Sequence, residues 1–183
     1  MRQWMTTALA VVALAGTVAE TAAAQGPEVG QPAPDFELTS VGRDGKAVPV
    51  KLSALKGQTV VLAFFPRVRT SGCTVQNDAY RDRYAELFKG GKGVQLFSVS
   101  VDAPEELASW AKDRDYPHRF LSDKDGIIGK PYGAYMESAK IDRRVLYVIG
   151  PDGKVAYKAT PFRETDPTAY ADLGAAITKV AGK

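Results

Sequence analysis

The strongest structural signal in the chain lies in residues 59–83, TVVLAFFPRVRTSGCTVQNDAYRDR. The segment opens with an unbroken apolar run from Val60 to Phe65, which is short for a helix and rich in β-branched and aromatic residues. Such a run predicts a strand that is buried on both faces of a sheet. Pro66 ends the strand, because proline has no N–H to donate to a sheet ladder.

A helix is predicted directly after this strand. Apolar residues recur at helical spacing from Tyr80 to Phe88, and a glycine-rich stretch after Lys89 ends the pattern. The helix begins near Ser71, so Cys73, the only cysteine of the chain, falls in its first turn.

This position favours a reactive thiol. N–H groups in the first turn of a helix have no helical partner and carry partial positive charge, which favours the thiolate, the nucleophilic form. The alternative is a small buried apolar residue, the usual role of a lone cysteine. The polar neighbours of Cys73 favour the first interpretation; they are Arg67, Arg69, Thr70 and Ser71.

The segment resembles the active site of the peroxiredoxins, the superfamily of thiol-specific antioxidant proteins and alkyl hydroperoxide reductases. The pattern of that family is a proline, three residues, a threonine or serine, two residues and the peroxidatic cysteine. Pro66, Thr70 and Cys73 match it at the required spacings. The resemblance is closest to the bacterioferritin-comigratory type, whose loop ends in a Gly-Cys-Thr step, as residues 72–74 do here. It also extends to residues 30–38, GQPAPDFEL, which match the opening of many peroxiredoxins.

Three positions depart from that type. It often has proline where Ser71 stands and glutamate where Gln76 stands. Many members keep a resolving cysteine five residues after the first, and Asp78 occupies that position here. The resemblance therefore implies a one-cysteine variant, in which the resolving thiol comes from outside the chain.

The remaining elements predict an α/β domain. The turn at residues 43–46 predicts an N-terminal hairpin, and further strands are predicted at residues 94–101, 119–121, 144–149 and 154–159. Helices are predicted from Pro104, over 125–132 and over 168–180, with Asp102 as the N-cap of the first. This order predicts a mixed sheet flanked by helices and matches the thioredoxin-like fold with the hairpin that peroxiredoxins add. Residues 134–142 give no clear prediction.

The first 24 residues form a separate unit. Arg2 precedes an uncharged apolar run from Met5 to Val18, and three alanines at 22–24 predict cleavage before Gln25. This pattern is typical of a secretory signal peptide, so a single domain is expected over residues 25–183. We expect an exported protein, periplasmic or extracellular. The run is shorter than the about 20 apolar residues of a spanning helix, and no cysteine follows the cut, so no stable membrane anchor is expected.

Composition narrows the function classes. The chain has 183 residues, 45% hydrophobic and 25% charged, with a net charge of only +3 and scattered basic residues, so nucleic-acid binding is not expected. One cysteine and one histidine exclude a structural zinc site of the usual kind, and no cofactor or metal is expected. His118, that histidine, is interpreted as a surface residue and Trp110 as a core residue.

The resemblance assigns roles to four residues. Cys73 attacks the peroxide, Thr70 donates a hydrogen bond, Pro66 shields the thiolate, and the second-site arginine of the family corresponds to Arg144, three residues before Tyr147. Arg143 is expected to face the other way, because strand side chains alternate. Arg67 and Arg69 are interpreted as solvated charges, and Gln76 as either a site residue or a surface residue.

The resulting prediction is a thiol-dependent peroxidase that reduces hydrogen peroxide or organic hydroperoxides through a sulfenic acid on Cys73. Its reductant would be a small thiol or a thioredoxin- or glutaredoxin-like protein, and its state a monomer or homodimer. A thiol–disulfide oxidoreductase is disfavoured because its C-x-x-C pair is missing. The alternative that stays open is an exported binding or holdase module of the same fold, with a non-catalytic cysteine.

Overall fold

The computed structural model describes residues 25–181, so the predicted leader at residues 1–24 lies outside the described residues. Within residues 25–181 no helix is both long and apolar enough to cross a membrane.

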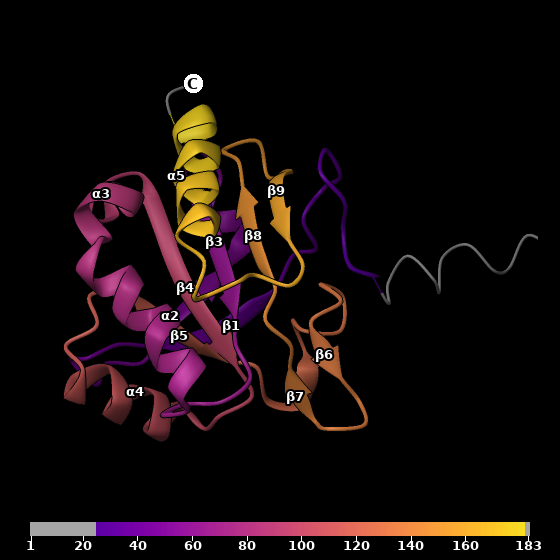
Figure 1. Cartoon of the computed structure of the whole chain (residues 1–183). Helices are drawn as coiled ribbons and strands as arrows, with labels where there is room; N and C mark the ends of the chain where they lie inside the picture. Colours follow the sequence, from indigo (N-terminus) through magenta and orange to yellow (C-terminus); the bar gives the residue numbers. More distant parts are fainter. Residues whose placement is uncertain (1–24, 182–183) are drawn as a thin grey trace, which may run out of the picture.

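A seven-stranded mixed sheet forms the centre of the molecule (Figure 1). Its strands, in the order in which they lie side by side, are β2 (Val48–Lys51), β1 (Glu37–Val41), β5 (Arg119–Ser122), β4 (Val94–Ser100), β3 (Thr59–Phe64), β8 (Leu146–Ile149) and β9 (Val155–Ala159). The pairs β3–β4 and β4–β5 are parallel, and the other neighbours are antiparallel. This confirms the predicted mixed sheet, the N-terminal hairpin β1–β2 and the later hairpin β8–β9.

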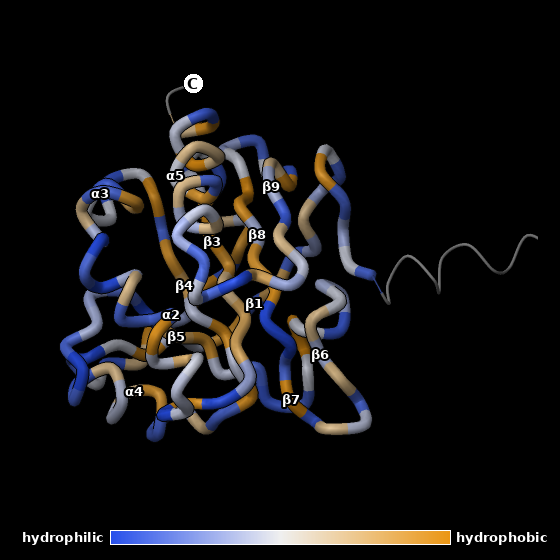
Figure 2. Tube along the Cα trace, in the orientation of Figure 1, coloured by the Kyte–Doolittle hydropathy of each residue, from blue (hydrophilic) through white to orange (hydrophobic). Residues whose placement is uncertain are grey.

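The strand predicted at residues 60–65 lies in the middle of the sheet. All six residues of β3 are buried, as expected for a strand covered on both faces. Val61 and Ala63 contact one hydrophobic cluster, and Val60, Leu62 and Phe64 contact another on the opposite face. Figure 2 shows the hydrophobic residues concentrated in these central strands.

The two faces of the sheet are covered differently. The helices α2 (Ser71–Asp82), α3 (Tyr84–Phe88) and α5 (Pro167–Ala181) pack on the face of Val61 and Ala63, with α4 (Pro104–Asp113) beyond them over β5 and β1. The opposite face is covered by the 3-10 turn η1 (Leu52–Leu55) and by the segment that carries Ile128 and Tyr132.

The predicted single helix from Ser71 to Phe88 is wrong at one point. Arg83, with φ −108° and ψ 19°, interrupts it and separates α2 from α3. After the break, Leu87 and Phe88 still face the cluster that holds Tyr80, and the Tyr80 and Phe88 ring centroids lie 5.6 Å apart. The turn therefore keeps the apolar stripe on the core while the chain bends toward β4.

The helix predicted over residues 125–132 is also wrong. The structure has a 3-10 turn there, η3 (Lys124–Gly126), followed by irregular turns. Asp125 and Gly126 have φ values of 66° and 71°, which an α-helix does not allow. The following segment, residues 134–142, had no clear prediction and forms a small hairpin of β6 (Tyr135–Met136) and β7 (Ile141–Asp142).

Candidate active site

Cys73 is the third residue of α2, directly beyond the carboxyl end of β3, as predicted. The residue is 1% exposed and packs in a cluster with Phe65, Trp110 and Phe120. Its sulfur therefore has an apolar floor, and water reaches it poorly.

The loop before α2 is fixed by an aspartate at the end of the neighbouring strand. Asp102 was predicted to cap α4, but the N-cap of α4 is Ala103. The Asp102 carboxylate instead accepts hydrogen bonds from the backbone N–H of Val68 and the hydroxyl of Ser100, both at 2.9 Å. A buried carboxylate needs such donors, and here they tie the cysteine loop to β4.

The structure brings Arg144 to Cys73. Both terminal nitrogens of its guanidinium, Nη1 and Nη2, lie 3.8 Å from Cys73 Sγ. Arg144 stands two residues before β8, and its neighbour Arg143 is exposed and Val145 buried. Arg144 therefore presents two donors and a permanent positive charge to the sulfur of Cys73.

Two further side chains hold the Arg144 guanidinium. Nη1 donates to Oε1 of Gln76, and Nε pairs with Oε2 of Glu164 at 3.0 Å. Gln76 is fully buried and uses its amide nitrogen to donate to the Tyr80 hydroxyl at 3.0 Å. Burial raises the pKa of Tyr80 well above its usual value, so this hydroxyl stays protonated.

Gln76 was a candidate site residue from the sequence, and Glu164 was not. Gln76 stands one turn after Cys73, which placed it as either a site residue or a surface residue, and the structure buries it at the site. Glu164 lies in the polar segment between β9 and α5, far from Cys73 in the sequence. No local pattern marks it.

Thr70 and Pro66 lie in the loop that leads from β3 into α2 and so precede Cys73 in the chain. Thr70 is the N-cap residue of α2, and its hydroxyl donates to the backbone carbonyl of Arg67 at 3.0 Å. Pro66 is half-buried, next to Phe65 in the floor of the cysteine cluster. Arg69 pairs with Asp113 of α4 at 2.5 Å, so its charge is directed away from Cys73.

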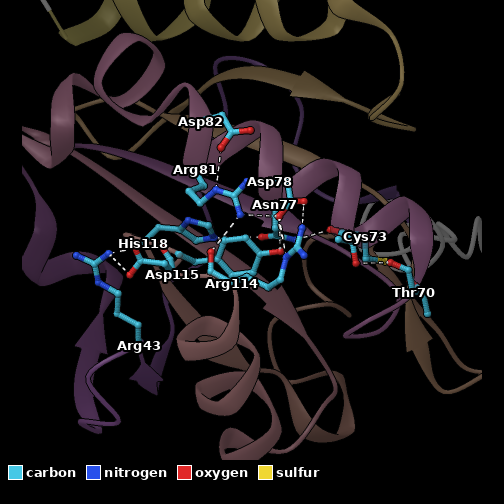
Figure 3. A network of polar contacts seen from close by, with 12 residues as sticks. Arg43, Thr70, Cys73, Asn77, Asp78, Arg81, Asp82, Arg114, Asp115 and His118 are labelled. Atoms are coloured by element: carbon cyan, nitrogen blue, oxygen red, sulfur yellow. Dashed lines mark hydrogen bonds and ion pairs between the residues drawn. The ribbon is translucent and has the colours of Figure 1, made fainter.

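The other side of α2 is held by a buried polar network (Figure 3). Asn77 donates from Nδ2 to the backbone carbonyl of Cys73 at 2.9 Å and accepts from the Ser98 hydroxyl at 2.7 Å. Nε2 of His118 lies 3.1 Å from both Asn77 Oδ1 and Ser98 Oγ. The interpretation of His118 as a surface residue is therefore wrong: it is buried, and burial lowers its pKa to about 3.

Asp78, at the position where many family members have a second cysteine, accepts from three donor side chains (Figure 3). Its carboxylate binds the guanidinium of Arg114 at the end of α4, the Arg81 guanidinium at 3.2 Å and the Tyr116 hydroxyl at 3.0 Å. These contacts anchor α2 to the end of α4.

Comparisons with known proteins agree with this site. Residues 29–158 match the AhpC/TSA family. The chain is 31% identical over 145 residues to peroxiredoxin Bcp of Escherichia coli K12, covering 76% of this chain and 89% of that protein. It is 33% identical over 127 residues to the chloroplastic peroxiredoxin Q of Sedum lineare, covering 69% and 65%. The crystal structure of peroxidoxin BcpB from Mycobacterium tuberculosis superposes with a TM-score of 0.70 at 28% identity, covering 83% of this chain and 97% of that one.

The family match spans most of the described chain, the relatives are peroxiredoxins of the Bcp and Q types, and the one cysteine lies in the first turn of α2. These findings agree with the resemblance seen in residues 59–83. The chain belongs to the AhpC/TSA family, and it is an oxidoreductase of the peroxiredoxin type, a thiol-dependent peroxidase.

Proposed function

We propose that the chain reduces hydrogen peroxide or organic hydroperoxides at Cys73, through a sulfenic acid that an external thiol resolves. The observation that carries the proposal is the approach of both Arg144 terminal nitrogens to Cys73 Sγ at 3.8 Å. The fork of donors faces the sulfur, and a peroxide that lines up with the sulfur would meet the same donors.

In the first step, the Cys73 thiolate attacks one oxygen of the peroxide. The S–O bond forms, the O–O bond breaks, and the electron pair of the broken bond leaves on hydroxide or alkoxide, which takes up a proton to give water or an alcohol. Arg144 stabilises the negative charge on the leaving oxygen, and the Thr70 hydroxyl turns from the Arg67 carbonyl to donate to the substrate. Pro66 limits the access of water to the sulfur.

In the second step, the sulfenic acid is reduced. The chain has one cysteine, so an external thiol attacks the sulfur, water leaves and a mixed disulfide forms. A second external thiol then attacks the disulfide and releases Cys73 in its reduced form. The external thiol is a small thiol or a thioredoxin- or glutaredoxin-like protein.

The test is intact-mass spectrometry of the reduced protein after brief exposure to stoichiometric peroxide, with a sulfenic-acid trap present. We expect trapping at Cys73 within seconds, at a rate far above that of free cysteine. Cys73→Ser should abolish both trapping and peroxide turnover. Oxidation of Cys73 no faster than that of free cysteine would contradict the proposal and favour the binding-module alternative.

The proposal includes export of the chain. The pattern of residues 2–24, with Arg2 before an uncharged apolar run and alanines at 22–24, supports it. Fractionation of cells that express the full chain, with N-terminal sequencing of the product, tests it. We expect a periplasmic or extracellular product that begins at Gln25, and a cytoplasmic product that keeps Arg2 would contradict it.

A further inference from the structure

The Arg144 guanidinium is held from two sides by groups of different charge. Gln76 accepts from Nη1 with a neutral amide, and Glu164 accepts from Nε with a carboxylate. The side chains of Arg144 and Glu164 are 15% and 22% exposed, so both ions are largely removed from water. A charge in such a place needs a partner, because water no longer stabilises it.

We infer that Glu164 is a positioning residue of the peroxidase site, which acts on Cys73 and the peroxide only through Arg144. The inference rests on the proposed function for the role of Arg144. Because Glu164 occupies Nε, the edge of the planar guanidinium that carries Nη1 and Nη2 is turned toward the sulfur. A rotation of the guanidinium would move these donors away from the leaving oxygen.

Gly72 shows how closely this ion pair lies against the start of α2. A Cβ atom at Gly72 would come within 2.6 Å of Glu164 Oε1 and 3.0 Å of Arg144 Nη2. Both distances are shorter than ordinary contacts, so only glycine leaves room for the pair beside the residue that precedes Cys73.

The segment that carries Glu164 is itself anchored. The Tyr170 hydroxyl donates to the backbone carbonyl of Glu164 at 2.8 Å, and the backbone N–H of Phe162 donates to the carbonyl of Arg144 at 3.0 Å. Phe162 is 1% exposed. The carboxylate is therefore presented from a fixed backbone.

The position of Glu164 determines which reaction it affects. Its hydrogen bond orients Arg144 toward the leaving oxygen of a peroxide, so it speeds the reaction of Cys73 with peroxide. Iodoacetamide has no leaving oxygen, so its reaction with Cys73 does not need this orientation of Arg144. A residue with only a structural role would change both reactions together.

The experiment measures the two reactions in separate assays at the same pH. The second-order rate constant of Cys73 with iodoacetamide reports on the thiol without any peroxide. The second-order rate constant with hydrogen peroxide reports on the orientation of Arg144. Glu164→Ala should slow the peroxide reaction roughly tenfold and leave the iodoacetamide rate constant within about twofold of the wild type.

A further variant separates charge from position. Glu164→Gln keeps an acceptor for Nε but removes the charge, so it should recover most of the peroxide rate. Glu86→Gln, which removes the carboxylate of the exposed Arg83–Glu86 pair, is the matched control and should change neither rate constant.

Equal peroxide rate constants for the wild type and Glu164→Ala would overturn the inference, as would a loss that Glu164→Gln does not recover. An equal loss in the iodoacetamide reaction of Glu164→Ala would also overturn it. A wild-type protein that reacts with peroxide no faster than free cysteine would instead contradict the proposed function.

Discussion

Arg144 and Arg114 both pair with a carboxylate beside α2, but the protein satisfies the hydrogen-bonding groups of the two clusters to different extents. At Arg144 the protein supplies two acceptors, from Gln76 and Glu164, and two guanidinium nitrogens are left facing Cys73 Sγ at 3.8 Å. At Arg114 the shared carboxylate of Asp78 accepts from three side chains, those of Arg81, Arg114 and Tyr116.

Under the proposed function, the difference separates a reactive site from a structural one. A guanidinium has five N–H donors, and those that the protein does not use are available to a substrate. A carboxylate with three donors has few acceptor positions left, and its contribution is to stability. By this proposal, the same pair of chemical groups serves the reaction at one end of α2 and attaches the helix at its side.

Replacement of Arg144 should have the largest effect on the reaction and tests this distinction first. Arg144→Ala should slow the reaction of Cys73 with peroxide roughly 10²–10³-fold, because the leaving oxygen loses its charged donors. Stopped-flow kinetics with hydrogen peroxide measures this effect. Arg143→Ala, at the exposed neighbour, should leave the rate constant unchanged, and an equal loss there would break the comparison.

Thr70→Val should have the next largest effect, a slowing of about 10²-fold at unchanged fold, because one donor to the peroxide is lost. Thr70→Ser keeps the hydroxyl and should retain most of the rate. Single-turnover kinetics and circular dichroism of both variants check this prediction. Near-normal rates in Thr70→Val would remove Thr70 from the mechanism and leave Arg144 as the main donor.

Asp78→Asn should show the opposite profile. Removing one partner of a half-buried ionic cluster should lower the free energy of unfolding by about 2 kcal/mol, with peroxide reactivity within a few-fold of the wild type. Urea unfolding measures the first value. Asp82→Asn, at an exposed carboxylate that pairs with Arg81 on the same helix, is the matched control and should cost less than about 1 kcal/mol. A loss of reactivity in Asp78→Asn as large as that of Arg144→Ala would mean that both clusters serve the reaction.

Asp142, two residues before Arg144, should make the smallest contribution. It affects how the free energy of unfolding depends on pH. Neither of its carboxylate oxygens has a hydrogen-bond partner in the described part of the chain, and burial, with Asp123 nearby, raises its pKa to about 8. The folded chain therefore keeps a proton that the unfolded chain has lost, so stability falls as pH rises from 6.5 toward 8. The slope of the unfolding free energy is at most about 1.4 kcal/mol per pH unit.

Urea unfolding at several pH values between 6.5 and 8 measures this slope. At the lower end of this window His118 adds a slope of opposite sign, because its ordinary pKa of 6.5 leaves it partly protonated in the unfolded chain while burial keeps it neutral in the folded chain. This contribution is the same in the wild type and in Asp142→Asn, so the difference between them isolates Asp142. Asp142→Asn should flatten the slope, and Asp152→Asn, at an exposed turn, should not. A slope that is unchanged in Asp142→Asn would place the titration on another group.

The comparison of the two clusters also shows what the sequence could and could not reveal. The strand at residues 60–65 and the helix start near Cys73 depend on hydrophobic period and on proline, which act over a few residues, and both were predicted. Arg144 was assigned from the register of the family, and the structure places it beside Cys73.

The side chains that hold these residues were missed because they come from distant segments. Glu164 reaches Arg144 from the segment before α5, and Asp78 meets Arg114 across 36 residues. His118 has the character of a surface residue in its local sequence, but the fold places it against Asn77 and Ser98. Asp102 lies where a helix N-cap is expected, but its carboxylate accepts a hydrogen bond from the backbone N–H of Val68 instead.

The single sulfur of the chain sets a limit on its capacity. Under the proposed chemistry each molecule takes up one oxygen atom, a change of two electrons, and then has no second thiol with which to close the cycle by itself. Throughput depends on how often the oxidised protein meets its reductant. When the reductant is scarce, the protein removes one peroxide per molecule and stops. The fraction of oxidised protein then reports the excess of peroxide over the available reductant thiol.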